Sequence, residues 1–214
     1  NDRSLALKSQ KREQDKLTAD EKKQKSMLQS LKKKEKNLLA KQQEQQKKVD
    51  ALNKKIEEMI AKQVRTTTTL TKEQQLIAGG FEANQGRLPW PVEKGFISGY
   101  FGKHQHPVHE HVTINNKGIY LQTVAGANAR AIYEGEVSSC AQINGNYAVI
   151  VQHGNYRTVY SPLKKIYVKQ GDKVKAKQAI GEIVTDTSED NKTELYFQIY
   201  KDRSIINPGL WLAQ

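Results

Sequence analysis

The sequence predicts an all-β globular domain that is preceded by a long α-helical arm. Residues 1–65 contain 19 Lys and Arg against 10 Asp and Glu, whereas residues 66–214 contain 16 against 13. All 14 Gly and all 5 Pro lie at or after Gly79, and no aromatic residue precedes Phe81. A segment without Gly, Pro or aromatic residues is typical of a helix and cannot build a compact core. We therefore expect the globular part to be C-terminal.

Residues 1–65 are predicted to form a coiled-coil arm. They consist mainly of Lys, Gln, Glu, Leu and Ala, which favour helix on an exposed surface. Apolar residues recur in two interleaved sets of heptad positions. The first set is Leu28, Glu35, Gln42, Val49 and Ile56, and the second is Leu31, Leu38, Gln45, Leu52 and Met59. Because the middle of this seam is polar, we expect weak pairing with a helix from upstream sequence or from a second copy of the chain.

Composition excludes several classes of function. The basic excess of the arm could bind nucleic acid, but its Lys and Arg are scattered around the helix and no aromatic residue is present to stack on bases. A solvated coiled-coil exterior explains the charge better, so no nucleic-acid partner is expected. No apolar run reaches the roughly 20 residues of a transmembrane helix. The single cysteine, Cys140, excludes a disulfide framework and is expected to be a packed thiol.

The start of the chain has neither an initiator Met nor a signal-peptide pattern. We therefore expect a processed fragment that lacks its targeting signal. Residues 66–87 are predicted to be a connector, because the four threonines at 66–69 disfavour helix. Within the connector, residues 70–78 are predicted to form a short amphipathic helix that stops at Gly79 and Gly80.

Residues 88–214 alternate short apolar runs with turn signals, which predicts a β-sandwich or partly open barrel. The expected strands cover residues 95–101, 118–123, 129–141, 147–153, 158–161, 179–184 and 194–200.

Several stretches of this domain resemble the LytM domain, the lysostaphin-type zinc endopeptidase fold. They are FGKHQHP (101–107), NKGI (116–119), AIYEGEV (131–137), VIVQHG (149–154), VKAKQAIG (174–181), LYFQI (195–199) and NPGLWL (207–212). The resemblance implies an all-β LytM/lysostaphin-like sandwich of the duplicated-hybrid type.

Active LytM enzymes use His and Asp ligands for zinc and further His residues for the attacking water, and the resemblance assigns these roles to five positions. In this sequence those positions are Asn116, Tyr120, Pro162, Glu194 and Tyr196. None of them is a histidine, so the resemblance implies a degenerate peptidase without zinc, cofactor or catalytic residues. A rebuilt metal site is the alternative, because His104, His106, His109 and His111 lie within eight residues. We interpret these histidines as loop residues.

A degenerate site can still bind a partner. Because side chains alternate along a strand, Leu195, Phe197 and Ile199 should point to the core, together with Ile119 and Leu121 of the neighbouring strand. The opposite side, which we call the groove face, then carries Gly118, Tyr120, Gln122, Glu194, Tyr196, Gln198 and Tyr200. Tyrosines are enriched at protein interfaces. We predict that Lys117, Tyr120, Glu194, Tyr196, Gln198 and Tyr200 bind a partner, although the tyrosines could instead fill space left by the metal.

A coiled coil joined to a degenerate LytM domain resembles the EnvC-type divisome factors, and LPWPV (88–92) also resembles that subgroup. This implies a non-catalytic periplasmic activator of zinc-dependent cell-wall amidases in cell division, peripheral to the inner membrane of a Gram-negative cell. Its coiled coil would dock on an FtsEX-like membrane complex, and peptidoglycan is a further possible ligand. In that picture a helix occupies the groove face until activation, and residues 70–78 are our candidate.

Two other functions stay open from sequence alone. The first is a zinc peptidoglycan endopeptidase or a peptidoglycan-binding module of the same family. The second is a periplasmic adaptor of an efflux or secretion system, since residues 168–181 resemble half of a lipoyl-type hairpin. Adaptors insert their coiled coil between two lipoyl halves. Here the coiled coil is wholly N-terminal, which argues against the adaptor.

Overall fold

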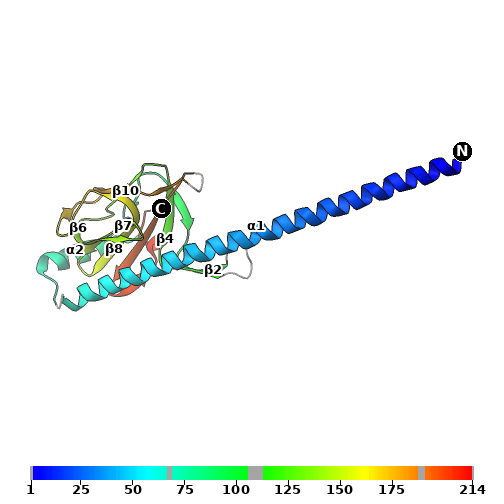
Figure 1. Cartoon of the computed structure of the whole chain (residues 1–214). Helices are drawn as coiled ribbons and strands as arrows, with labels where there is room; N and C mark the ends of the chain where they lie inside the picture. Colours follow the sequence, from blue (N-terminus) through cyan, green and yellow to red (C-terminus); the bar gives the residue numbers. More distant parts are fainter. Residues whose placement is uncertain (1, 67–68, 106–112, 188–190, 214) are drawn as a thin grey trace. The chain divides into compact units, whose positions relative to one another are not determined.

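The structure, a computed structural model, describes residues 2–66, 69–105, 113–187 and 191–213. The chain divides into two compact units, Asn1–Ala51 and Leu52–Gln214. Helix α1 (Asp2–Thr66) continues from the first unit into the second (Figure 1). The globular unit thus begins inside the range that the sequence assigns to the arm, because the last turns of α1 pack on the β domain.

The first unit consists of α1 alone, as the composition predicts. The seam residues Leu28, Leu31 and Leu38 are more than half exposed. An isolated helix with exposed leucines gains little stability beyond its propensity. Pairing of this segment with another helix therefore stays a prediction. No described helix is long and apolar enough to cross a membrane.

The globular unit is mostly β-sheet, which confirms the predicted fold class. Its strands are β1 (Phe96–Gly99), β2 (Gly102–Gln105), β3 (Thr113–Asn116), β4 (Ile119–Thr123), β5 (Asn128–Arg130), β6 (Gly135–Ile143), β7 (Asn146–His153), β8 (Tyr156–Ile166), β9 (Lys173–Val174), β10 (Ala179–Ile183), β11 (Thr185–Asp186), β12 (Lys192–Lys201) and β13 (Ser204–Ile206). Two helical elements accompany them, α2 (Lys72–Ala83) and the 3-10 turn η1 (Pro208–Leu210).

The main sheet is antiparallel and has the strand order β1-β4-β12-β8-β7-β6-β9. Strand β10 pairs with β5 and β8, while β11 and β13 pair with β12, and β2 and β3 form a separate ribbon. The single strand predicted over 129–141 is wrong. The chain leaves the sheet after Arg130, because Ala131 forms its backbone hydrogen bonds with the loop at Lys177 and Gln178.

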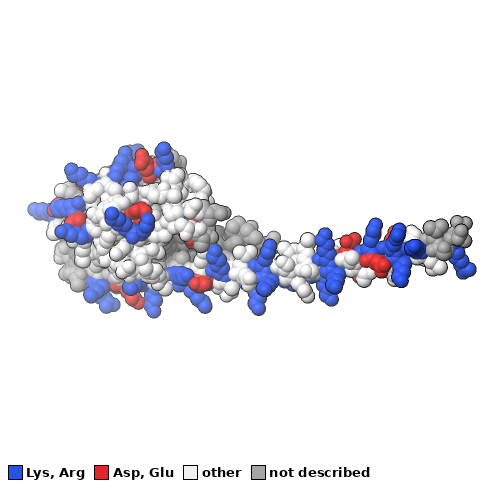
Figure 2. Space-filling view, turned by 45° about the horizontal axis from the view of Figure 1, so that its top comes forward, with Lys and Arg blue, Asp and Glu red and all other residues white. Residues whose placement is uncertain are grey.

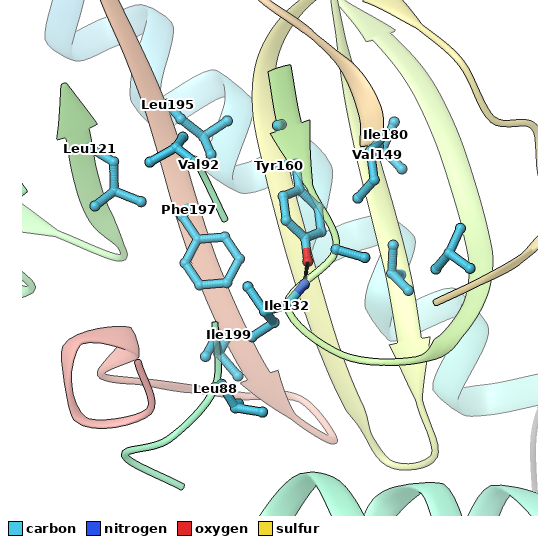
Figure 3. Packing of buried hydrophobic residues seen from close by; sticks show 14 of the residues in the cluster. Leu88, Val92, Leu121, Ile132, Val149, Tyr160, Ile180, Leu195, Phe197 and Ile199 are labelled. Atoms are coloured by element: carbon cyan, nitrogen blue, oxygen red, sulfur yellow. Dashed lines mark hydrogen bonds between the residues drawn. The ribbon is translucent and has the colours of Figure 1, made fainter. Parts of the chain in front are cut away.

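The main core lies on the inner side of the sheet (Figure 3). Leu195, Phe197 and Ile199 of β12 point into it. Tyr160 is also fully buried, and its hydroxyl accepts a hydrogen bond from the backbone N–H of Ile132 at 3.1 Å. Burial raises the pKa of Tyr160 to about 12, so the phenol stays neutral inside the core.

Helix α2 begins at a capping box in which Thr71 and Gln74 each bond the backbone of the other. The predicted stop at Gly79 and Gly80 is wrong, since α2 continues through both residues to Ala83. A Cβ on Gly80 would lie 2.4 Å from the Tyr133 hydroxyl, so glycine is needed there for close packing. Phe81 is fully buried in the core. Its ring lies against those of Tyr133, His153, Tyr156 and Trp211.

Candidate partner-binding site

Strands β4 and β12 build the groove face. They pair in antiparallel register with Tyr120 opposite Tyr196 and Gln122 opposite Glu194. As the alternation predicts, the inward residues Ile119, Leu121, Leu195, Phe197 and Ile199 are buried in the core. The Tyr120 and Tyr196 rings stack with their centroids 4.6 Å apart. The two strands thus bring the predicted tyrosines together on one side of the sheet.

The last turns of α1 cover this side of the sheet, and Figure 1 shows the cyan end of α1 beside β8. Ile56 and Ile60 are buried there, with Leu52, Met59 and Val64 packed around them. The sheet contributes Ile143, Ala148, Ile150, Val159 and Tyr200 to the same cluster. As a result Tyr196 and Tyr200 are only 2% and 1% exposed.

This arrangement corrects one expectation. A helix covers the groove face at Tyr196, Gln198 and Tyr200, whereas Tyr120, Gln122 and Glu194 stay partly exposed. The helix over it is the end of α1 and not the predicted segment 70–78. Residues 72–78 of that segment lie in α2, which packs on the core through Phe81. The physical reason is the apolar spacing of Leu52, Ile56 and Met59, which suits a sheet face as well as a coiled-coil partner.

A polar contact fixes the position of the helix on the strands. The Oδ1 atom of Asn53 accepts hydrogen bonds from Nε2 of Gln198 at 3.1 Å and from the hydroxyl of Tyr196 at 3.3 Å. All three side chains are buried. Gln198 Nε2 also lies within hydrogen-bond distance of the Lys117 carbonyl, at 3.1 Å. Glycine at position 118 allows the backbone there to lie close to β12, because a Cβ would be 2.5 Å from the Phe197 carbonyl oxygen.

An ion pair and a second amide flank this contact. Lys117 Nζ lies 2.6 Å from Glu57 of α1, and both side chains are about 40% exposed, so solvent weakens the pair. Farther along α1, Gln63 Nε2 donates to the Ser138 carbonyl of β6 at 3.1 Å. The predicted partner-binding residues Lys117, Tyr196 and Gln198 therefore contact or support the helix.

Some buried polar atoms on this side of the sheet lack a hydrogen-bond partner within the described part of the chain. They are Nε of Arg157, Oγ of Ser161, Oε1 of Gln198 and the hydroxyl of Tyr200. Burial lowers the pKa of Arg157 and raises that of Tyr200. The interface between α1 and the sheet therefore contains polar groups as well as apolar side chains.

The residues at the former zinc positions do not fit a catalytic zinc site, which needs three protein ligands. Asn116 donates its amide to the Tyr100 carbonyl at 2.9 Å, and the Tyr196 hydroxyl donates to Asn53. Glu194 bonds Ser98 and Lys192. Pro162 has no ligand atom in its side chain. Among the described residues, no three His, Cys, Asp or Glu side chains lie close enough to hold a metal ion.

The other candidates of the sequence analysis are four histidines and Cys140. His104 is in β2, whereas His106, His109 and His111 lie outside the described residues. Cys140 is partly buried, and burial raises its thiol pKa. The sequence analysis missed Asn53, Glu57 and Ile60. Their spacing on one helical face was the available signal, but a coiled-coil seam has the same spacing.

Residues 114–208 match peptidase family M23. The chain is similar to the solved SpoIIQ–SpoIIIAH pore-forming complex, with 26% identity and a TM-score of 0.51 over 60% of this chain and 92% of that one. Residues 114–208 thus carry a match to an M23 domain of the LytM type, and the fold of the globular unit agrees with it. This finding confirms the recognised family and fold.

Two curated relatives are similar to part of this chain. The murein hydrolase activator EnvC of Escherichia coli is 27% identical over 138 residues, which cover 64% of this chain and 31% of EnvC. The peptidoglycan DD-endopeptidase ShyB of Vibrio cholerae is 36% identical over 96 residues, or 42% of this chain and 22% of ShyB. The chain spans less than a third of the length of these relatives.

Proposed function

We propose that this protein is a non-catalytic regulator of peptidoglycan hydrolases in the periplasm, and that it acts by binding a cell-wall amidase through its groove face. The similarity to the murein hydrolase activator EnvC supports the class of partner. The side chains at the former zinc positions support the absence of catalysis, because none is an imidazole and all but Pro162 are engaged by neighbouring residues.

The observation that carries the proposal is the burial of the groove face beneath the end of α1. Tyrosine-rich surfaces with central buried residues are typical protein-binding sites. The same surface already binds an amphipathic helix through Ile56, Ile60 and Asn53. In the proposed mechanism this segment holds the groove face closed. A partner then binds when the end of α1 is drawn away.

The test compares release variants for binding and activation of purified zinc-dependent cell-wall amidases. Replacing Ile56 and Ile60 with Asp places charges in an apolar cluster and should detach the segment. We expect this variant to bind and activate an amidase at least tenfold better than the parent. A matched control is Leu28→Asp with Leu31→Asp, because these leucines are exposed on the first unit. A folded release variant that activates no amidase would contradict the proposal.

A second experiment tests whether the partner binds at the groove face. Tyr196→Ala in the release background should lower activation at least tenfold, since a central interface tyrosine contributes about 2 kcal/mol or more. Thermal melting must show that this variant stays folded. If the doubly changed protein activates normally, the tyrosines fill space and the partner binds elsewhere.

A zinc endopeptidase is the second candidate, and the identity with ShyB favours it. Metal analysis of the purified protein and release of dye from labelled peptidoglycan distinguish the two. We expect no stoichiometric zinc and no turnover above background, with or without added zinc. Zinc with turnover would establish the enzyme. Sedimentation with insoluble peptidoglycan tests separately whether the domain binds the polymer.

We further propose that residues 1–51 bind an FtsEX-like complex of the inner membrane. The exposed seam leucines Leu28, Leu31 and Leu38 support pairing of this helix with another. Co-purification of the full chain with such a complex should be lost in the Leu28→Asp, Leu31→Asp variant and kept in Ile56→Asp, Ile60→Asp. Equal co-purification by both variants would contradict this role.

A further inference from the structure

The connection between β8 and β10 carries a strong concentration of positive charge. Residues 163–178 contain six lysines and a single acidic residue, Asp172. We call residues 165–178 the lysine loop. All five lysines of this loop are exposed. Figure 2 shows Lys and Arg side chains in several groups over the visible face of the globular unit, with Asp or Glu side chains beside most of these groups.

Most of this charge is not neutralised. Among the described residues, no carboxylate forms an ion pair with Lys165, Lys169, Lys175 or Lys177, whereas Lys173 pairs with Glu73 at 2.7 Å. The carboxylate of Asp172 accepts a hydrogen bond from the backbone N–H of Lys169 at 3.0 Å. Exposed charges are screened beyond the Debye length of about 8 Å at physiological salt, so these four ammonium groups act on a surface that lies directly against the loop.

The backbone holds this charge in a defined shape. The Tyr167 N–H donates to the Ile180 carbonyl at 2.7 Å and closes the loop at its base. One turn at Lys169–Asp172 bonds to Val137, and a second at Lys175–Gln178 bonds to Ala131. Lys177 has a φ of 65°, in the left-handed region that favours glycine. A lysine therefore occupies a position where the backbone conformation disfavours a residue with a Cβ. Residues in such conformations are concentrated at functional sites.

An exposed aromatic ring completes the surface. Tyr167 is 46% exposed, and Lys165 Nζ lies 5.7 Å from its ring centroid. Its hydroxyl donates to Asn128 at 3.0 Å, which fixes the ring at the base of the loop. An amphipathic ring beside lysines suits the interface between lipid headgroups and water.

We propose that the lysine loop binds the surface of an anionic phospholipid bilayer. Several lysines with flexible side chains in one segment are attracted to an anionic membrane surface. A single phosphate or carboxylate group is bound better by the planar guanidinium group of arginine. Nucleic acid is disfavoured because Tyr167 is the loop's only aromatic residue. Strand β9, which lies within the loop, is at the opposite end of the strand order from β4. This inference does not depend on the proposed function.

The test is sedimentation of the full chain with vesicles. One set contains phosphatidylglycerol mixed with phosphatidylcholine, and the other contains phosphatidylcholine alone. The loop variant replaces Lys165, Lys169, Lys175 and Lys177 with Gln. The arm variant replaces the exposed Lys32, Lys33, Lys34 and Lys36 with Gln and makes the same change in net charge.

We expect binding to the anionic vesicles only. The loop variant should bind at least about tenfold more weakly, because each basic side chain near an anionic surface strengthens binding several-fold. The arm variant should stay within about threefold of the parent, and both variants should keep the parent's melting temperature within a few degrees. An equal loss in the arm variant, or no loss in the loop variant, would overturn the proposal. So would release by inorganic phosphate beyond that of NaCl at the same ionic strength, which would indicate a discrete phosphate site.

Discussion

The side-chain oxygen of Asn53 accepts a hydrogen bond from Gln198, 145 residues later in the chain, at 3.1 Å. Both side chains are buried, with exposures of 4% and 0%. An amide pair in this position specifies one register of helix on strand, because a shift of one helical turn would leave a buried donor without its acceptor. This contact therefore determines which part of α1 covers the groove face.

Replacement of Asn53 should loosen the end of α1. In Asn53→Ala the donors of Gln198 and Tyr196 lose their shared acceptor, which should weaken docking of the segment by about 1–3 kcal/mol. Amide hydrogen exchange measured by mass spectrometry should become faster in residues 52–66. Lys54→Ala is the control, because Lys54 is an exposed neighbour on the same helix. Unchanged exchange in Asn53→Ala would show that apolar packing alone holds the segment.

Two glycine substitutions should have opposite effects on stability. A Cβ on Gly118 would lie 2.5 Å from the Phe197 carbonyl oxygen, so Gly118→Ala should destabilise the domain by about 1–3 kcal/mol. Gly79 lies inside α2 with nothing within 4 Å of its Cβ position, and Gly79→Ala should stabilise by about 0.5–1 kcal/mol. Urea unfolding of both variants and the parent measures the two changes. A neutral Gly118→Ala would mean that β4 and β12 separate easily.

Acid should destabilise the domain through His153. This side chain is fully buried, and burial lowers its pKa from 6.5 to about 4. In the unfolded chain His153 is protonated below about pH 6.5, whereas in the folded chain it stays neutral down to about pH 4. The free energy of unfolding therefore decreases as the pH falls through this window. The loss should be about 2 kcal/mol by pH 5.

The neutral variant His153→Gln isolates this effect. Its free energy of unfolding is expected to be lower at pH 7, because the ring contacts the Glu134 carbonyl and the Thr158 hydroxyl. Its decline between pH 6.5 and 4 should nevertheless be shallower than that of the parent. Parallel profiles for the two proteins would assign the acid sensitivity to other groups.

Lys177→Gly should stabilise the fold, since glycine adopts the φ of 65° without a Cβ clash. The left-handed conformation costs a residue with a Cβ roughly 1–2 kcal/mol, so a net gain of about 1 kcal/mol is expected after the entropy of glycine is subtracted. Lys175→Gly, in the same loop without a positive φ, should not stabilise. A gain in stability with weaker binding to anionic vesicles would show that the lysine is kept for its charge.

Local pattern predicted most of the fold. All Gly, Pro and aromatic residues lie at or after Gly79. This difference in composition distinguished a helical arm from a β domain. The two-residue alternation along 194–200 assigned Leu195, Phe197 and Ile199 to the core, because successive side chains of a strand face opposite sides. Motifs in sequence order identified the LytM-type domain, and residues 114–208 match its family.

The local sequence pattern could not show at which residue the long helix begins to pack on the β domain. Ile56 and Met59 read as coiled-coil positions, since a helix presents the same apolar stripe to another helix or to a sheet. Only the folded chain brings Asn53 to Gln198 and Ile60 to Tyr200. Likewise Gly79 and Gly80 read as a helix stop, but burial of Phe81 outweighs their low propensity and α2 continues. The sequence by itself determined the division into a helical arm and a β domain and the inward faces of β4 and β12. The tertiary structure decided that the groove face is covered and which helix covers it, because that choice depends on contacts between residues far apart in the chain.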